Sequence, residues 1–309
     1  MDRPLPARRS GRDGAGGEVS RRSAIASLVT ACLIWALTFP LIKAVLPSIS
    51  PLAFNALRFV LATPFVAPAL RRVRRQEWLA GGMIGIFLAA GFAVQTIGLQ
   101  YTSASRSAFI TALYVPLTPI VAFLGYRARP AALELAGLLL AVAGMFLLTR
   151  PDQAAGGINS GDLLTLACAV MFACQLVAVG HFARRFPLER LLAVQIAVAA
   201  AVSTLLVPLF ESVRVVPSPF LYFAIAFEVL AATVLALRLQ LGGQKELGET
   251  EAAIIFATEP LLAALASMVA LGEQLSTAQW MGGVLILAGM LVPARGRSAT
   301  RGSSTNDGR

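Results

Sequence analysis

The sequence has little charge, little histidine and little cysteine. Charged residues make up 14% of the chain and hydrophobic residues 57%, whereas about a quarter of an average soluble domain is charged. The cysteines are Cys32, Cys168 and Cys174, and an odd, scattered set forms no disulfide framework. His181 is the only histidine, so the chain lacks the clustered ligands of a zinc site. We therefore expect no metal and no cofactor.

Acidic residues are outnumbered by basic ones, 16 to 26, which gives a formal net charge of +10. Such a balance can indicate nucleic acid binding when basic and aromatic residues form a continuous stripe. Here the basic residues lie between long apolar runs and at the termini, and no such stripe exists. We therefore expect no nucleic acid partner, and we predict that the chain is embedded in a lipid bilayer.

The apolar runs have the length of transmembrane helices, because a bilayer core requires about 20 apolar residues per helix. The fifth connection, RPDQAAGGINSGD, is long and polar and divides the chain into two halves. The pattern predicts an all-α integral membrane protein with ten transmembrane helices, at about 24–45, 51–70, 79–98, 105–124, 131–149, 162–181, 188–209, 219–238, 250–271 and 276–293.

The basic residues between these runs predict the orientation. With both termini in the cytoplasm, 21 lysines and arginines face the cytoplasm and 3 face the other side, as the positive-inside rule requires. The tails, 1–22 and 294–309, are rich in Arg, Gly and Ser and are predicted to be disordered. We expect a multi-pass protein of the plasma (inner) membrane of a bacterium.

The two halves, 23–150 and 161–293, contain matching residues in the same order. Ala31-Cys32 matches Ala167-Cys168, Pro51 matches Pro187, and Pro116 matches Pro260. An odd number of helices in each half would invert the second half relative to the first. Inverted five-helix repeats are typical of secondary transporters, which bind substrate between the repeats near the bilayer midplane.

Three stretches resemble the EamA-type branch of the drug/metabolite transporter superfamily: WALTFPLIKAVLPSISPLAFNALRF, GLQYTSASRSAFITALYVPLTPIVAFL and TEPLLAALASMVALGEQLS. The resemblance covers about residues 23–293. It implies ten helices in two five-helix repeats and the export or exchange of small metabolites. The substrate varies widely within this family and does not follow from the resemblance.

Three ionisable residues lie deep inside predicted spans, where a charge is costly and often functional. Glu259 is central in the ninth span, and Glu228 is central in the eighth. Arg58 lies too deep in the second span for easy access to water, so it requires an acidic partner or a wet cavity. Each of the three also has a structural interpretation: a carboxyl bonded to backbone freed by Pro260, an interhelical hydrogen bond, and a buried ion pair.

Further candidates for a substrate cavity are aromatic or neutral and polar, since binding pockets combine apolar walls with a few polar groups. The alternative for each is ordinary packing between helices. Paired helix interruptions in two repeats also point to a transporter's site. The substrate-binding candidates of this kind are Trp35, Phe39, Tyr114, Gln95, Thr111 and Gln175, and the predicted helix breaks are Pro116, Pro119 and Pro260.

These features favour a secondary transporter, an exporter of amino acids or of cationic or amphiphilic compounds that works by alternating access and could use a proton gradient. The alternatives are a membrane-embedded lipid-modifying enzyme and a channel. The sequence shows no catalytic cluster, so we expect no enzyme activity. The stretch GGMIG, residues 81–85, has the spacing of a helix-dimerisation motif and is the basis for a homodimer.

Overall fold

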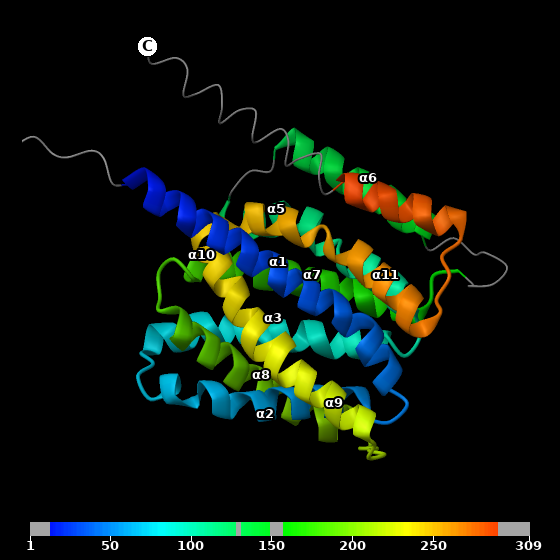
Figure 1. Cartoon of the computed structure of the whole chain (residues 1–309), viewed down its shortest axis with the longest axis horizontal. Helices are drawn as coiled ribbons and strands as arrows, with labels where there is room; N and C mark the ends of the chain where they lie inside the picture. Colours follow the sequence, from blue (N-terminus) through cyan, green and yellow to red (C-terminus); the bar gives the residue numbers. More distant parts are fainter. Residues whose placement is uncertain (1–12, 128–130, 149–156, 290–309) are drawn as a thin grey trace, which may run out of the picture.

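The computed structural model describes residues 13–127, 131–148 and 157–289. Residues 1–12 of the predicted N-terminal tail and the whole predicted C-terminal tail, 294–309, lie outside the described residues. Residues 13–22, which were also predicted to be disordered, are helical and belong to the helix Asp13–Val45. Every regular element in the described part is a helix, apart from one isolated antiparallel bridge between Ile49 and Val215. The helices run largely along one direction and form a single elongated bundle (Figure 1).

The bounds of the helices follow the apolar runs of the sequence closely. Residues 277–289 form a final helix after α11. The labelled elements are α1 (Asp13–Val45), α2 (Pro51–Leu70), α3 (Arg75–Gly98), α4 (Ala104–Thr111), α5 (Tyr114–Tyr126), α6 (Ala132–Leu148), α7 (Ser160–Phe182), α8 (Leu188–Phe210), α9 (Pro219–Phe227), the π-helix η1 (Glu228–Leu235), α10 (Ala236–Phe256) and α11 (Glu259–Leu271).

Eight helical segments in the described residues are long and apolar enough to cross a membrane, with mean hydropathy between 1.4 and 2.2. The sequence predicted ten. The fifth predicted span corresponds to α6, whose apolar part, Leu135–Leu147, is shorter than a bilayer core requires. The tenth corresponds to the helix at 277–289, and the rest of that predicted span lies outside the described residues.

The predicted loop between the eighth and ninth spans is wrong. Residues 239–249 were assigned to a connection, but α9, η1 and α10 continue without a break from Pro219 to Phe256. The apolar part runs from Pro219 to Leu247, and the next begins at Ile254. Eight of the eleven residues at 239–249 are Leu, Gln, Lys or Glu, which are good helix formers, and the helix also continues through the three glycines of this stretch.

The two interrupted helices have the same construction, 145 residues apart. The break at Ala112-Leu113 separates α4 from α5, and the break at Ala257-Thr258 separates α10 from α11. Both α5 and α11 have 13 residues, and they are followed by Arg127 and Gly272 in the left-handed conformation. The sequence paired Pro116 with Pro260 at an offset of 144, so that register is off by one residue. Pro119 lies inside α5, which continues through it.

Close packing between α3 and α8 depends on two glycines. A Cβ atom on Gly81 would lie 2.7 Å from Cβ of Val194, and one on Gly85 would lie 2.7 Å from the carbonyl oxygen of Gln195. Such distances are too short for real atoms. The small residues of GGMIG therefore pack within the chain, and the motif no longer supports a homodimer.

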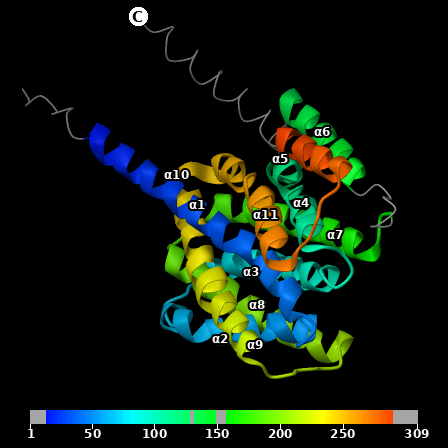
Figure 2. The same cartoon turned by 45° about the vertical axis from the view of Figure 1, so that its right-hand side comes forward.

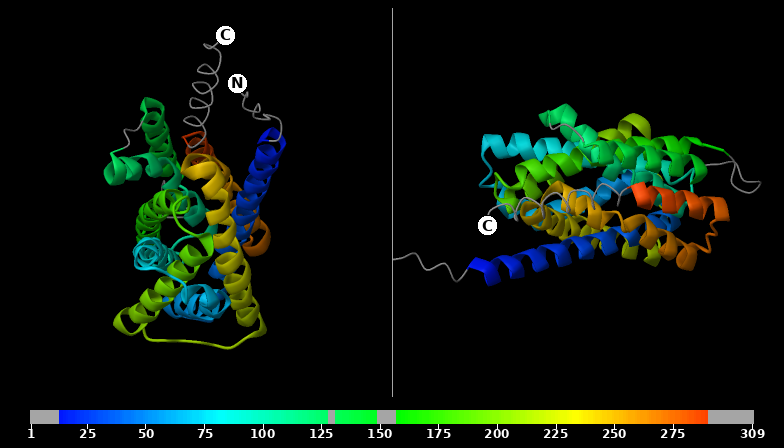
Figure 3. Two further views of the ribbon diagram at one scale, coloured as in Figure 1. Left: turned by 90° about the vertical axis from the view of Figure 1, so that its left-hand side faces the viewer. Right: turned by 90° about the horizontal axis from the view of Figure 1, so that it is seen from above.

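Two further interfaces extend the bundle. α1 lies along one side of it, next to α10 (Figures 2 and 3). α6 lies beside the helix at 277–289, where Gly144 packs on the carbonyl of Gly282 and Gly289 packs on the carbonyl of Gly137. Gly137 and Gly282 are 145 residues apart, as are Gly144 and Gly289, so each of these two contacts joins one glycine of the first pair to one of the second.

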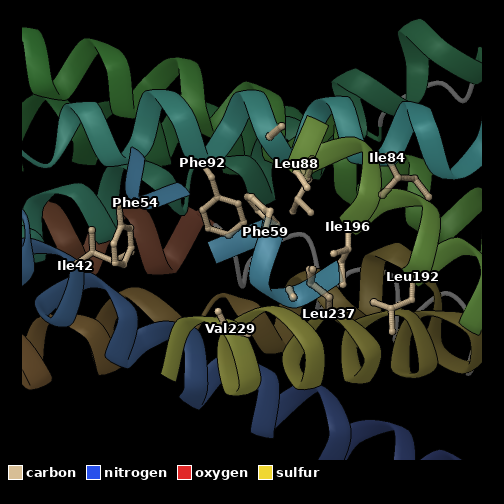
Figure 4. Packing of buried hydrophobic residues seen from close by; sticks show 14 of the residues in the cluster. Ile42, Phe54, Phe59, Ile84, Leu88, Phe92, Leu192, Ile196, Val229 and Leu237 are labelled. Atoms are coloured by element: carbon tan, nitrogen blue, oxygen red, sulfur yellow. The ribbon is translucent and has the colours of Figure 1, made fainter. Parts of the chain in front are cut away.

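The hydrophobic core lies where α2, α3, α8 and the segment from η1 to α10 meet. Phe59 of α2 and Phe92 of α3 contribute neighbouring rings, with centroids 5.8 Å apart. Ile196 of α8 and Val229 of η1 close the cluster from the opposite side (Figure 4). This core places Phe92 between the packed interior and the cavity described below.

Candidate functional site: a central cavity with one carboxyl

A cavity of about 50 Å³ lies between the two predicted halves of the bundle. Its walls come from α1, α3, α4, α5, α7, α10 and α11, so both interrupted helices contribute. Seven of the nine predicted binding residues line it. The lining residues are Trp35, Thr38, Phe39, Leu88, Phe92, Gln95, Thr111, Tyr114, Phe172, Gln175, Leu176, Leu237, Gln240, Phe256 and Glu259.

Glu259 contributes the carboxyl of this cavity from the first residue of α11, where the break at Ala257-Thr258 places it. Its side chain is 8% exposed. The hydroxyl of Tyr114, the first residue of α5, donates to Oε2 of Glu259 over 3.4 Å. No arginine, lysine or histidine is among the lining residues that the structure describes. Glu259 therefore has the free capacity to bind a cation that enters the cavity.

The other polar groups of the wall are neutral and largely bonded to one another. Gln175 and Gln240 exchange hydrogen bonds of 3.2 Å in both directions. The amide nitrogen of Gln95 donates to the hydroxyl of Thr111 over 3.3 Å. Amides and hydroxyls can donate and accept, so these groups can orient a ligand without carrying a charge.

Aromatic rings supply most of the apolar wall. Trp35 and Phe256 have ring centroids 5.5 Å apart, and Phe92 and Phe172 meet edge to face at 5.1 Å. The indole nitrogen of Trp35 donates to the carbonyl of Ala232 over 3.0 Å. Aromatic faces attract cations, so the rings and Glu259 favour the same charge in a ligand.

Arg58 and Glu228, the other two predicted ionisable residues, lie behind this wall. Both side chains are fully buried, with Nη1 of Arg58 2.9 Å from Oε2 of Glu228. Nε of Arg58 donates to the hydroxyl of Thr233 over 2.6 Å, and its guanidinium lies 4.1 Å from the centroid of the Phe92 ring. The structure thus pairs the two residues, and Phe92 stands between the guanidinium and the cavity.

The π-helix η1 contributes the glutamate of this ion pair, and α2 contributes the arginine. Glu228 begins the π-helix and Thr233 lies within it, where its hydroxyl donates to the carbonyl of Glu228 over 2.6 Å. The carbonyl of Ala232 accepts from both Nη2 of Arg58 and the indole of Trp35. π-Helices often occur at functional sites. Here the carbonyl of Ala232 in η1 connects the ion pair to Trp35 of the cavity wall.

The lining residues form pairs at two constant separations. In α1 and α7, Trp35 and Phe172, Thr38 and Gln175, and Phe39 and Leu176 are each 137 residues apart. In the remaining helices the separation is 145 residues. The pairs at that separation are Phe92 with Leu237, Gln95 with Gln240, Thr111 with Phe256 and Tyr114 with Glu259.

A wider polar pocket lies at one end of the bundle, where α3 ends and α4 begins. Nζ of Lys43 donates to the carbonyls of Leu99 and Thr102 over 2.5 and 2.8 Å. The carboxylate of Glu273 accepts from the first two backbone N–H groups of α4, over 2.7 and 2.9 Å. Lys43 and Glu273 therefore bond to backbone groups around the end of α3 and the start of α4, and we assign them a structural role.

Sequence reasoning missed half of the wall. Gln240 was assigned to a cytoplasmic connection, although its spacing of 145 residues from Gln95 was available as a signal. Phe92, Phe172 and Phe256 are apolar residues in apolar helices, and only the packing shows that their rings face the cavity. A bond from Glu259 to backbone freed by Pro260 was also expected, whereas the contact observed is with Tyr114.

Comparison with known proteins agrees with this architecture. The sequence model of the EamA-like transporter family matches residues 22–150 and again 159–294, so the chain belongs to this family. A crystal structure that is 24% identical in sequence superposes with a TM-score of 0.66, covering 88% of this chain and 96% of that one, which supports the fold.

Curated relatives carry the same description. An uncharacterised transporter of Archaeoglobus fulgidus is 32% identical over 91% of this chain and 89% of its own length. The uncharacterised transporter YyaM of Bacillus subtilis is 29% identical over 82% of this chain and 88% of its own. The protein is thus a multi-pass membrane transporter, which argues against the enzyme alternative.

Proposed function

We propose that this protein is a secondary transporter that exports small organic amines with an apolar or aromatic body. The observation that carries the proposal is the central cavity, in which Glu259 supplies a carboxyl among aromatic rings and neutral amides. A carboxylate and aromatic faces both favour a cation. An amino acid would also bring a carboxylate, for which the described wall offers no cationic partner.

The proposed mechanism is alternating access between two inverted five-helix repeats, 23–150 and 161–293. The constant separations of the lining residues support it, as does the matching construction of α4–α5 and α10–α11. The packing supports it too. In the second half α7 corresponds to α1 and α10 corresponds to α3, so the contact of α3 with α7 has its counterpart in the contact of α10 with α1. Two equivalent halves could then adopt one another's conformations, opening the cavity first to one side and then to the other.

Proton coupling is proposed to reside at Glu259. The carboxyl would hold either a proton or the ammonium group of the substrate, so that binding of one releases the other. In the proposed orientation, with both termini in the cytoplasm of a bacterial plasma membrane, an inward proton gradient would then drive export. Tyr114, at the equivalent position of the first repeat, remains neutral and can orient the carboxyl through its hydroxyl.

A comparison of three related compounds tests the proposed substrate class. Proteoliposomes that contain the full chain are given phenethylamine, phenylalanine or 3-phenylpropionate, with and without a pH gradient. We expect gradient-driven transport of phenethylamine, at least tenfold slower transport of phenylalanine, and no transport of phenylpropionate. Equal rates for phenethylamine and phenylalanine would refute the assignment of amines as substrates.

A pair of variants tests the role of Glu259. Glu259→Gln keeps the size of the side chain but cannot ionise. Losing a hydrogen bond to a charged group costs about 1.5–3 kcal/mol, so amine affinity should fall by about 10- to 150-fold. Glu246→Gln, which removes an exposed carboxylate of α10, serves as the matched control and should leave affinity unchanged. Wild-type affinity and gradient dependence in Glu259→Gln would overturn the mechanism.

A further inference from the structure

A second pocket lies at the opposite end of the bundle from Lys43 and Glu273, between the end of α2 and the start of α8. This pocket is open to solvent and has a volume of about 520 Å³. Its walls carry two arginines from the turn after α2 and one arginine and one glutamate from the first turn of α8. The helices α2 and α8 pack against each other. The lining residues are Pro68, Ala69, Arg71, Arg72, Pro187, Glu189 and Arg190.

Positive charge in this pocket exceeds negative charge. Arg190 is paired with Glu77 at 2.8 Å, and Glu189 is paired with Arg238 at 2.7 Å. Arg71 and Arg72 are both exposed, and among the described residues neither forms an ion pair. Two guanidinium groups are therefore available to an anion. Guanidinium forks bind phosphate oxygens in pairs, which suits them to phosphate better than to a point anion.

The start of α8 adds to this preference. Helix α8 has 23 residues, and no side chain caps its first turn. The N-terminal end of a helix carries partial positive charge and unbonded N–H groups, both of which favour an anion. The helix end supplements the arginines, which remain the main attraction.

An apolar stripe leads from the hydrophobic belt into the pocket. Leu61, Phe65 and Pro68 follow one another at spacings of four and three residues, so they share one face of α2, and Arg72 lies in the turn just after this helix. The side chains of Leu61 and Phe65 are 42% and 59% exposed. In a membrane these two side chains face acyl chains. A ligand that lies along this face meets hydrocarbon contacts first and the arginines at its end.

We propose that this pocket binds the phosphate group of an anionic phospholipid, with Arg71 and Arg72 on the phosphate oxygens and an acyl chain along Leu61 and Phe65. Basic pockets between transmembrane helices are suited to anionic headgroups. The amphipathic shape of the surface favours a lipid over a free phosphate compound. In the proposed orientation this end faces the cytoplasmic leaflet. The inference is independent of the substrate of the central cavity.

Native mass spectrometry of the purified full chain tests the site. Phosphatidylglycerol and phosphatidylcholine with identical acyl chains are added separately, and glycerol 3-phosphate is added as a competitor. We expect at least tenfold preference for phosphatidylglycerol and no displacement by glycerol 3-phosphate at equal concentration. Equal binding of the two lipids would overturn the proposal. Efficient displacement by glycerol 3-phosphate would overturn the lipid as the source of the phosphate.

A matched pair of double variants separates this site from general charge attraction. Arg71→Gln/Arg72→Gln removes the unpaired arginines of the pocket. Arg184→Gln/Arg185→Gln removes two exposed arginines just before α8 that do not line the pocket. We expect at least a tenfold loss of phosphatidylglycerol binding in the first variant and less than a twofold loss in the second, with both proteins monodisperse. Equal losses in the two variants would refute a defined site.

Discussion

The buried ion pair of Arg58 and Glu228 allows a sharp test of whether these residues act as a unit. Removing one partner leaves the other charge buried and unpaired, which costs about 3–5 kcal/mol. Both side chains are fully buried and 2.9 Å apart, so water cannot replace the missing partner without rearrangement. We therefore expect Arg58→Met and Glu228→Met each to destabilise the protein by about 3–5 kcal/mol.

The double variant should behave differently. Replacing both members of a buried pair by apolar residues of similar size is often neutral or stabilising, because two desolvation costs disappear together. Arg58 also bonds Thr233 and the carbonyl of Ala232, so the double variant loses these contacts, each worth about 1–2 kcal/mol. We expect Arg58→Met/Glu228→Met to lie within about 2 kcal/mol of the wild type.

Thermal unfolding followed by tryptophan fluorescence measures these effects. At about 2 °C per kcal/mol, the lower end of the range for large domains, each single variant should unfold about 6–10 °C below the wild type. The exposed pair of Arg238 and Glu189, with side chains 61% and 56% exposed, is the control. Removing either of those partners should cost at most about 1 kcal/mol.

Two outcomes would contradict this reasoning. Single variants at the ion pair that are as mild as the surface control would mean that Arg58 or Glu228 reaches water or another partner. A double variant as unstable as either single one would mean that the loss comes from packing rather than from an unpaired charge. Amine transport by a stable double variant would indicate that the pair is structural, whereas its loss would place the pair in the transport cycle.

Three further predictions concern packing, topology and the cavity wall. Gly85→Ala places a methyl group 2.7 Å from the carbonyl oxygen of Gln195 and should lower the unfolding temperature by several degrees, whereas Gly82→Ala, with nothing within 4 Å, should not; equal effects would contradict the α3–α8 packing. A reporter active only outside the cytoplasm, fused to the C-terminus, should be silent, and a strong signal would refute the predicted orientation. Phe256→Ala, which removes a ring beside Trp35, should weaken amine binding by about 1 kcal/mol or more, measured in the same proteoliposome assay; unchanged affinity would show that the ring does not contact the substrate.

Much of the fold could be predicted from the sequence because a bilayer constrains the chain strongly. A helix makes all the hydrogen bonds of its own backbone, and unpaired backbone groups are costly in hydrocarbon. Each apolar run of sufficient length therefore predicts a span. The runs at 51–70 and 188–209 agree with α2 and α8 to within one residue. The prediction failed at 239–249, where polar residues were taken to indicate a loop although their helix propensity is high.

The candidate cavity was only partly predictable, and the reason lies in what periodicity can encode. Glu259, Tyr114 and Gln95 stand out because polar groups are rare inside apolar helices. Gln240 was missed because residues 239–249 were assigned to a connection. The three phenylalanines do not stand out, because an apolar side chain in an apolar helix can face lipid, core or cavity with equal sequence cost. Only the placement of neighbouring helices determines which of these surroundings a side chain meets.

The sequence by itself determined the membrane class, the main helices and the presence of charged residues within them. The tertiary structure alone decided how those charges are used. It buries Arg58 against Glu228 behind Phe92 and leaves Glu259 facing the cavity beside Tyr114. The physical reason is that the state of a buried charge depends on the nearest opposite charge, and a contact between residues 58 and 228 arises only when α2 packs against η1.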